Sequence, residues 1–253
     1  MSRSLLLLLV LLAWPVYAEG QGTAYDALKI VGTRLSRAYI SRVVSVNGTD
    51  GDPQPRTWRI VVQDRTLPAG VREIVVQNGQ IIADGAPSGA AGGTIRAPIK
   101  TAQLNLDSSG AFEVANHTAD ASHTNFARVN YTLRSNERGS PVWIVSLLDG
   151  QRRAVGTIHI AANRGGITRV EGMYAGANMA NVEQDPVRRG GRRNDSVERE
   201  PPDPVENSAE DDDDGDVNPV KKEIKRMFRR TKSDAERMFA RVRRPFEDFF
   251  YRR

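Results

Sequence analysis

Three histidines are the residues with the widest choice of chemistry in this chain, because an imidazole can bind a metal or move a proton near neutral pH. His117 and His123 lie six positions apart around a predicted helix, and His159 falls in a stretch of alternating polar and apolar residues. A metal site would need a third ligand at a suitable spacing, and the sequence offers none beside this pair. We interpret the histidines as surface or strand positions, and we predict no metal or other cofactor.

Two aspartates occupy equivalent places in two similar stretches. In residues 58–64 and 143–149, a tryptophan and an aspartate lie six positions apart around aliphatic residues. Paired carboxylates could serve acid–base catalysis. Asp64 and Asp149 each precede turn-forming residues, however, and an aspartate at a strand end caps a turn with its own side chain. We predict that both are turn residues and that the two tryptophans are core anchors.

An acidic run at 210–216 resembles a calcium-binding loop, because carboxylates surround Gly215. With Gly215 in the sixth position of an EF-hand loop, Lys221 occupies the twelfth, where a bidentate glutamate is required. A solvated, self-repelling linker is therefore our interpretation, with weak calcium association as the alternative.

The sequence has no serine nucleophile elbow, phosphate-binding loop or dinucleotide fingerprint. We predict that the chain is not an enzyme, an unrecognised hydrolase being the alternative.

The C-terminal region carries the most specific pattern. From Val220 to Val242, apolar residues recur at spacings of three and four, which places them on one side of a helix that is otherwise basic. Asn218 and Pro219 suit the start of a helix, and Pro245 ends it before an aromatic C-terminus. Such a helix can lie in a membrane interface, with its apolar side in the acyl boundary and its cations on anionic headgroups.

We therefore predict that this helix binds an anionic membrane surface or envelope polymer. Docking of its apolar side on the folded region is the alternative, and an envelope protein or peptidase is a further possible partner. Nucleic acid is not predicted, because export separates the chain from it and no basic strand platform with aromatic residues is present. The residues predicted to contact the anionic surface are Lys221, Lys222, Lys225, Arg226, Met227, Phe228, Arg229, Arg230, Met238, Phe239, Arg241, Arg243 and Arg244.

Export is expected from the N-terminus. Residues 1–18 combine a basic start at Arg3, an apolar run too short to cross a bilayer, and a cleavage site ending at Ala18, as in a secretory signal peptide. The chain has no cysteine, which excludes disulfides and thiolate metal sites. An exported chain without disulfides is typical of a bacterial envelope, so we predict the periplasm or the cell surface.

Strand-like alternation dominates the middle of the chain and occurs there twice. A predicted helix and three predicted strands, the last leading into a Gly-containing turn, recur with matched positions about 85 residues apart. We predict an α+β fold with two tandem α-β-β-β units and antiparallel sheets. The predicted division is 23–84 for the first unit, 85–100 for a Gly- and Ala-rich linker, 101–174 for the second unit, 183–218 for a disordered charged linker, and 219–253 for the basic amphipathic helix and aromatic end.

Several short motifs of the second unit carry a family resemblance. They are Asp107-Ser108-Ser109-Gly110-Ala111-Phe112, Pro141-Val142-Trp143-Ile144-Val145, Asp149-Gly150 and Gly165-Gly166-Ile167. With these motifs, the second unit resembles the PepSY family of small exported bacterial modules, and the first unit resembles it less closely. The resemblance implies a non-catalytic binding or regulatory module, in a family associated with peptidase propeptides and regulation. The first unit lacks an Asp-Ser pair before its helix, and neither unit adjoins a peptidase domain. A soluble regulator or inhibitor of an envelope peptidase is the alternative to surface binding.

Overall fold

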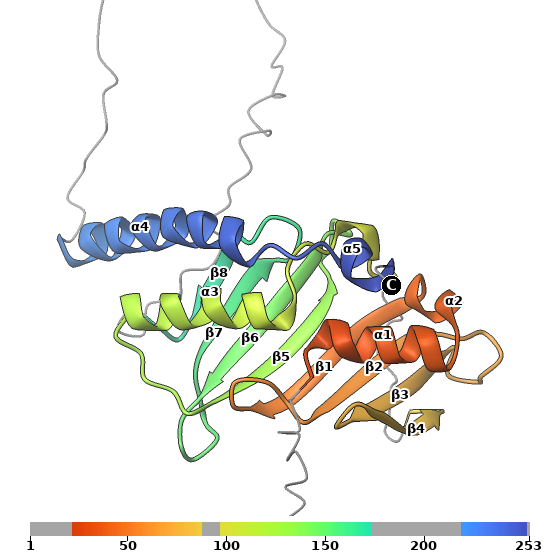
Figure 1. Ribbon diagram of the computed structural model, residues 1–253. Coiled ribbons are helices and arrows are strands. Elements are labelled where there is room, and N and C mark those ends of the chain that lie inside the picture. The colour runs from red at the N-terminus through yellow and green to blue at the C-terminus, as the bar shows by residue number, and fades with distance from the viewer. Residues whose placement is uncertain (1–21, 88–96, 174–218, 252–253) are drawn as a thin grey trace, which may run out of the picture.

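One eight-stranded antiparallel sheet forms the centre of the protein (Figure 1). The computed structural model describes residues 22–87, 97–173 and 219–251, apart from the side chains of 219–229 and 232. The strands lie in the order β4-β3-β2-β1-β5-β6-β7-β8. Consecutive strands are neighbours in the sheet except β4 and β5, because β5 pairs with β1 at the centre. The predicted α+β class and the C-terminal helix are thereby confirmed, whereas the predicted signal peptide at 1–18 and charged linker at 183–218 lie outside the described residues.

Both halves of the sheet are built in the same order, a helix followed by four antiparallel strands. The first half consists of α1 (Ala24–Arg34), the short α2 (Arg37–Ile40), β1 (Val43–Gly51), β2 (Thr57–Gln63), β3 (Val71–Gln77) and β4 (Gln80–Gly85). The second half consists of a 3-10 turn, η1 (Thr101–Gln103), then α3 (Ser108–Ala121), β5 (Arg128–Ser135), β6 (Pro141–Leu148), β7 (Ala154–Ala161) and β8 (Ile167–Glu171).

Each half has one strand more than we expected. Asn78 and Gly79 both have positive φ angles, 47° and 77°, as the tight turn of a two-residue hairpin requires. The chain must therefore return beside β3, and it does so as β4. Gly165, with a φ of 70°, lies in the corresponding turn before β8. The returning strands were missed for two reasons: β4 is an edge strand with no buried side chain, and β8 is only five residues long.

The two halves join through the pairing of β1 with β5, in which Val46 faces Leu133 and Asn47 faces Thr132. Of the predicted linker at 85–100, Gly85 ends β4 and residues 88–96 lie outside the described residues. Ile99 is buried, and its N–H donates to the carbonyl oxygen of Val43 at 2.6 Å. The end of this segment therefore packs as part of the core.

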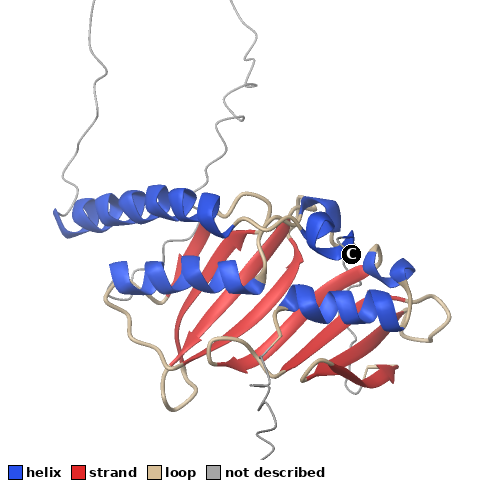
Figure 2. Ribbon diagram, viewed as in Figure 1, coloured by secondary structure: helices blue, strands red, loops and turns tan. Residues whose placement is uncertain are grey.

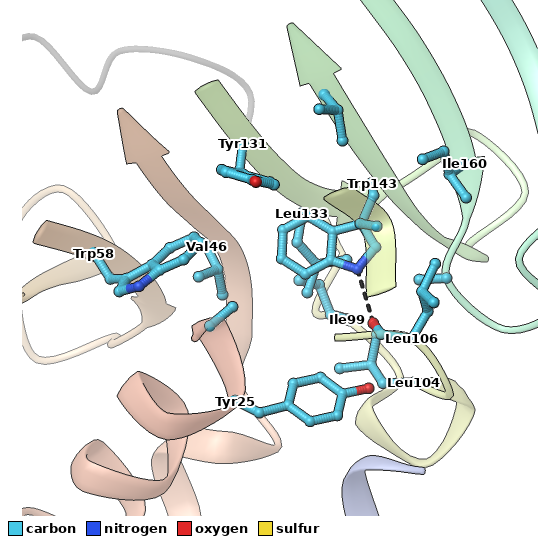
Figure 3. Packing of buried hydrophobic residues seen from close by; sticks show 14 of the residues in the cluster. Tyr25, Val46, Trp58, Ile99, Leu104, Leu106, Tyr131, Leu133, Trp143 and Ile160 are labelled. Atoms are coloured by element: carbon cyan, nitrogen blue, oxygen red, sulfur yellow. Dashed lines mark hydrogen bonds between the residues drawn. The ribbon is translucent and has the colours of Figure 1, made fainter. Parts of the chain in front are cut away.

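The helices cover one face of the sheet (Figure 2). Helices α1 and α3 point their N-termini towards each other above the junction of β1 and β5 (Figure 1). The core beneath them contains a row of aromatic rings (Figure 3), in which Tyr131 lies 5.8 Å from Trp58 and 6.2 Å from Trp143 between ring centroids. The opposite face of the sheet carries half-buried polar side chains such as Asn47 and Thr132, because alternate residues of each strand point away from the helices.

Each tryptophan links a strand to the start of a helix, which confirms their prediction as core anchors. The indole N–H of Trp58 donates to the carbonyl oxygen of Gly22 at 2.7 Å, and that of Trp143 donates to the carbonyl oxygen of Leu106 at 2.8 Å. In both cases the acceptor residue directly precedes the helix N-cap. The equivalent bonds fix both helices at the same place above the sheet.

The C-terminal segment adds two helices to this layer. Helix α4 (Pro219–Val242) lies beside α3, and α5 (Phe246–Tyr251) lies near α1 and α2 (Figure 1). Among the helices that the structure describes, none is both long and apolar enough to cross a membrane.

The two indole hydrogen bonds differ in burial, which gives a prediction. Leu106 is fully buried, so Trp143→Phe would leave its carbonyl oxygen without a partner, whereas the half-buried carbonyl of Gly22 can turn to water after Trp58→Phe. We expect Trp143→Phe to lower the free energy of unfolding by about 1–2 kcal/mol more than Trp58→Phe does. Urea unfolding of protein produced from Glu19 onward measures both values. Equal losses, or a larger loss for Trp58→Phe, would contradict this account.

Candidate functional site

The structure does not bring the three histidines together. Nε2 of His117, on α3, lies 3.9 Å from a carboxylate oxygen of Asp234 on α4, and Nε2 of His159, on β7, lies 3.8 Å from Glu171. His123 follows the end of α3 in a left-handed conformation with a φ of 53°. Burial lowers the pKa of His159, so its imidazole is a weak base. Within the described ranges, no group of three His, Cys, Asp or Glu side chains could hold a metal ion.

Asp64 and Asp149 are turn residues, as predicted. Oδ1 of Asp64 accepts hydrogen bonds from the N–H and the hydroxyl of Thr66, and Oδ2 accepts one from Arg72. Asp149 likewise accepts the N–H and the guanidinium of Arg153. These hydrogen bonds lower the pKa of both carboxyls, that of Asp64 to about 2. Both side chains are therefore ionised structural acceptors, not a catalytic pair.

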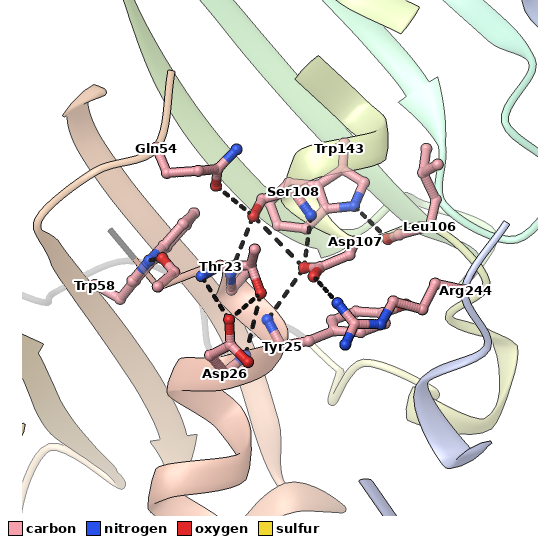
Figure 4. A network of polar contacts seen from close by, with 12 residues as sticks. Thr23, Tyr25, Asp26, Gln54, Trp58, Leu106, Asp107, Ser108, Trp143 and Arg244 are labelled. Carbon is pink, nitrogen blue, oxygen red and sulfur yellow. Dashed lines mark hydrogen bonds and ion pairs between the residues drawn. The ribbon is translucent and has the colours of Figure 1, made fainter. Parts of the chain in front are cut away.

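A fully enclosed carboxylate lies where α1 and α3 meet (Figure 4). Asp107 is 1% exposed, and its Oδ1 accepts the N–H of Ser108 at 2.7 Å and the N–H of Tyr25 at 3.1 Å. The hydroxyl of Ser108 accepts the N–H of Ala24 at 3.0 Å and lies 2.7 Å from Oε1 of Gln54, to which it donates. Two residues at the start of α3 thus cap both helices, which would otherwise have buried N–H groups without acceptors.

The charge of Asp107 is balanced only in part. Its Oδ2 accepts no hydrogen bond within the described chain, and Nη1 of Arg244, from the C-terminal segment, lies 3.6 Å away. Burial raises the pKa of Asp107 to about 6, and the nearby charge of Asp26 adds to that rise. Burial also raises the pKa of Tyr25, whose hydroxyl therefore stays protonated. This group can hold elements together and can take up a proton near pH 6. The hydroxyl of Ser108 lies 3.5 Å from Oδ1 of Asp107 but makes its shorter hydrogen bond to Gln54, and it is fully buried.

The junction between α1 and α3 combines one expected cap with contacts that local sequence patterns do not reveal. The Asp-Ser pair at 107–108 was recognised before the second predicted helix, and Asp107 is the N-cap of α3, but its contact with α1 was not foreseen. The first helix was thought to lack a comparable cap. Thr23 and Asp26 in fact form a capping box there, each side chain accepting a backbone N–H at the position of the other.

Helix α4 docks on the body along its apolar side. Thr231 and Ala235 are buried, and Met238, Phe239 and Val242 pack against the core. Two glycines make room for these side chains. The ring of Phe239 occupies the space that a Cβ at position 165 would need. A Cβ at position 110 would lie 3.2 Å from Val242.

Helix α5 docks by a second set of contacts. Phe246 and Phe250 are buried, with the rings of Phe246 and Tyr25 4.9 Å apart between centroids. The ring of Phe250 occupies the space that a Cβ at Gly32 of α1 would need. Two backbone hydrogen bonds of 2.8 Å, from Arg244 N–H to the Asn105 carbonyl and from Phe246 N–H to the Leu104 carbonyl, fasten the segment to the chain before α3.

The predicted surface-binding residues therefore divide into three groups. Arg230, Arg241 and Arg243 are exposed, and Arg244 is about half exposed beside Asp107. Met238 and Phe239 are half-buried against the body, so they cannot enter an acyl layer while α4 is docked. Periodicity revealed an apolar side of the helix but not the surface it meets. The remaining predicted residues belong to α4, but their side chains lie outside the described residues: Lys221, Lys222, Lys225, Arg226, Met227, Phe228 and Arg229.

Comparison with family models, with curated proteins and with solved structures finds no significant match to this chain. Inference about function therefore rests on the geometry of the molecule, and the resemblance to PepSY modules stays a prediction.

The enclosed carboxyl of Asp107 gives the chain a pH dependence. An aspartate in an unfolded chain has a pKa near 3.9, whereas burial raises that of folded Asp107 to about 6. Between these values the folded state binds more protons, so the contribution of Asp107 to stability falls as pH rises from 4 to 6. We expect the free energy of unfolding of the wild type, minus that of Asp107→Asn, to fall by roughly 2 kcal/mol from pH 4 to pH 7.

Chemical denaturation at several pH values measures this difference. The exposed carboxylate of Asp248 supplies a charge-matched control, and the difference between wild type and Asp248→Asn should change much less over the same interval. A difference for Asp107→Asn that is constant with pH, or that increases, would contradict the enclosed position of this carboxyl.

Docking of α5 can be tested by the coupling of two substitutions. Because Phe250 occupies the space that a Cβ on Gly32 would need, Gly32→Ala should destabilise the wild type by roughly 1–3 kcal/mol through overpacking. In a Phe250→Ala background the ring is absent and Ile40, 3.1 Å from the added Cβ, is the remaining close neighbour, so the same substitution should cost less. A double-mutant cycle on unfolding free energies measures the coupling. Additive effects would mean that α5 does not pack on α1 in solution.

Proposed function

We propose that this chain is a non-catalytic exported binding protein, built from two PepSY-like units, that holds a basic helix against an anionic surface of a bacterial envelope. The docking of α4 carries the proposal. Its apolar side is buried on the body at Thr231 and Ala235, and the arginines at 230, 237 and 241 are exposed. Spacings of seven and four place these three arginines on one side of the helix, where a charged surface can reach them together.

The charge of this helix suits an anionic partner. Between residues 219 and 244 the sequence has eleven basic and three acidic residues, while the whole chain has a net charge of only +5. Asp234, one of the three acids, lies 3.8 Å from Arg237 and offsets part of its charge. A lysine or arginine close to an anionic lipid surface contributes about 1 kcal/mol of attraction, and salt weakens it. The concentrated charge of the helix, and not the net charge of the protein, is therefore the basis of binding.

Two observations support the assignment of two related units. A helix and four antiparallel strands follow each other twice, and the same indole-to-carbonyl hydrogen bond fixes each helix. Asp64 and Asp149, six residues after the two tryptophans, each cap a turn in the same way. An internal duplication explains these equivalences, because separate origins would not reproduce the same hydrogen bonds at matched positions.

A soluble regulator of an envelope peptidase is the second candidate. It is favoured by the burial of Met238 and Phe239, which leaves the docked helix without its own apolar side for a bilayer. It predicts that the protein binds or inhibits a peptidase and shows no affinity for anionic surfaces.

A test of the proposal removes the exposed charges of α4. We expect protein produced from Glu19 onward to float with vesicles of phosphatidylcholine and phosphatidylglycerol in low salt, and to float less in high salt. The triple variant Arg230→Gln, Arg237→Gln, Arg241→Gln should bind at least tenfold more weakly, given about 1 kcal/mol for each charge near the surface.

A matched variant removes the same number of charges elsewhere. Arg56, Arg65 and Arg152 are exposed on loops of the sheet, so their replacement by Gln should have a much smaller effect. If both triple variants lose affinity equally, net charge and not α4 governs binding. If the wild type binds neither these vesicles nor a soluble polyanion, the proposal is wrong.

A further inference from the structure

We propose that the anionic surface is a lipid bilayer, and that the protein inserts into it the corner formed by Leu35 at the end of α1 and Tyr251 at the end of α5. The inference rests on the proposed binding of an anionic surface by α4 and names its partner. We call Leu35, Phe249, Phe250 and Tyr251, with the cations around them, the α5 corner.

Exposed apolar side chains gather at this corner. Among the described residues, the exposed large apolar side chains are Leu35 at 38%, Ile82 at 56% and Tyr251 at 61%. Leu35 directly follows α1, three residues after Gly32, which is in contact with Phe250. The guanidinium of Arg37, two residues after Leu35, lies 5.9 Å from the ring centroid of Tyr251. The contact of Arg37 with Tyr251 places the segment that follows Leu35 beside the end of α5, whereas Ile82 lies apart on the edge strand β4.

Cations surround the aromatic rings of the corner. The ammonium of Lys29 lies 4.9 Å and the guanidinium of Arg244 lies 4.0 Å from the ring centroid of Phe249. Arg34, Arg37 and Arg243 are exposed nearby along the chain. Glu247 and Asp248 are the carboxylates of α5, and Arg244 also lies 3.6 Å from the buried carboxylate of Asp107. Aromatic rings beside lysine and arginine suit the headgroup layer, where rings find apolar contact and cations meet phosphate.

The corner continues the surface proposed for α4. Figure 1 shows α4 and α5 following each other along the same border of the helix layer, joined at residues 243–245. A soluble polyanion would require only the cations of this border. Transfer of the exposed apolar area of Leu35 and Tyr251 out of water lowers the free energy of binding only where the partner offers hydrocarbon. This area therefore distinguishes a bilayer from a polymer.

The insertion is shallow because the rest of α5 holds the body together. Phe246 and Phe250 are buried against α1, and the backbone of the segment is bonded to Leu104 and Asn105. Only the two exposed side chains need to leave water, and the docked fold is unchanged. Attachment then combines a small apolar contact with the charge of α4, as is typical of peripheral membrane proteins that use two weak signals.

The experiment compares one double variant with a matched control. Leu35→Ser, Tyr251→Ser should lower partitioning into phosphatidylcholine–phosphatidylglycerol vesicles by roughly three- to tenfold, from the apolar area lost. Its affinity for dextran sulfate, which has charge but no hydrocarbon, should equal that of the wild type. Ile82→Ser removes a comparably exposed apolar side chain away from the corner, and it should change neither measurement. Tyr251→Trp should partition more strongly than the wild type, and brominated lipid should quench its added fluorescence.

The outcomes separate the two proposals. If the double variant floats like the wild type, or if Ile82→Ser loses as much affinity, the α5 corner is not the insertion site, while binding through α4 stands. If the wild type binds dextran sulfate but not anionic vesicles, the partner is a polymer and the bilayer inference is overturned. If the wild type binds neither, both proposals fail.

Discussion

Two helices that begin inside a protein, pointing at each other, create a problem of hydrogen bonding. The first N–H groups of α1 and α3 have no acceptors within their own helices, and both starts are buried above the centre of the sheet. Asp107 and Ser108 provide acceptors for both, and Thr23 with Asp26 completes the start of α1. The carboxylate also faces the positive ends of two helix dipoles, which favours its charge against the cost of burial. This small polar group joins the helix starts of the two halves above the pairing of β1 with β5.

The same group connects the body to the C-terminal segment. Arg244 reaches Asp107 from the segment that links α4 to α5, while backbone bonds and buried phenylalanines secure the chain on either side. Docking has a functional consequence because it decides which side of α4 meets the solvent. The apolar side is used for packing, and Arg230, Arg237 and Arg241 are left exposed. The aromatic end of the chain is divided in the same way, with Phe246 and Phe250 inside and Tyr251 outside.

Much of the fold could be predicted because it follows from local patterns. Trp58 and Trp143 with their aspartates marked the repeat, and alternation marked the central strands. Asn78 and Gly79 marked a hairpin, yet β4 was missed because an edge strand with few buried side chains has little periodicity of its own. The union of eight strands into one sheet was not predictable, since pairing of β1 with β5 depends on contacts between residues 78 to 89 positions apart.

The sequence by itself determined that residues 219–242 form a helix with one apolar side and a basic remainder, because helical periodicity is a property of neighbouring residues. It also determined the caps and turns at Asp64, Asp107 and Asp149. Only the tertiary structure decided that the apolar side of α4 meets the body, that Arg244 faces a buried carboxylate, and that Arg37 meets the ring of Tyr251. These facts depend on the complementary shapes left by Gly32, Gly110 and Gly165, and such shapes exist only once distant segments have packed together.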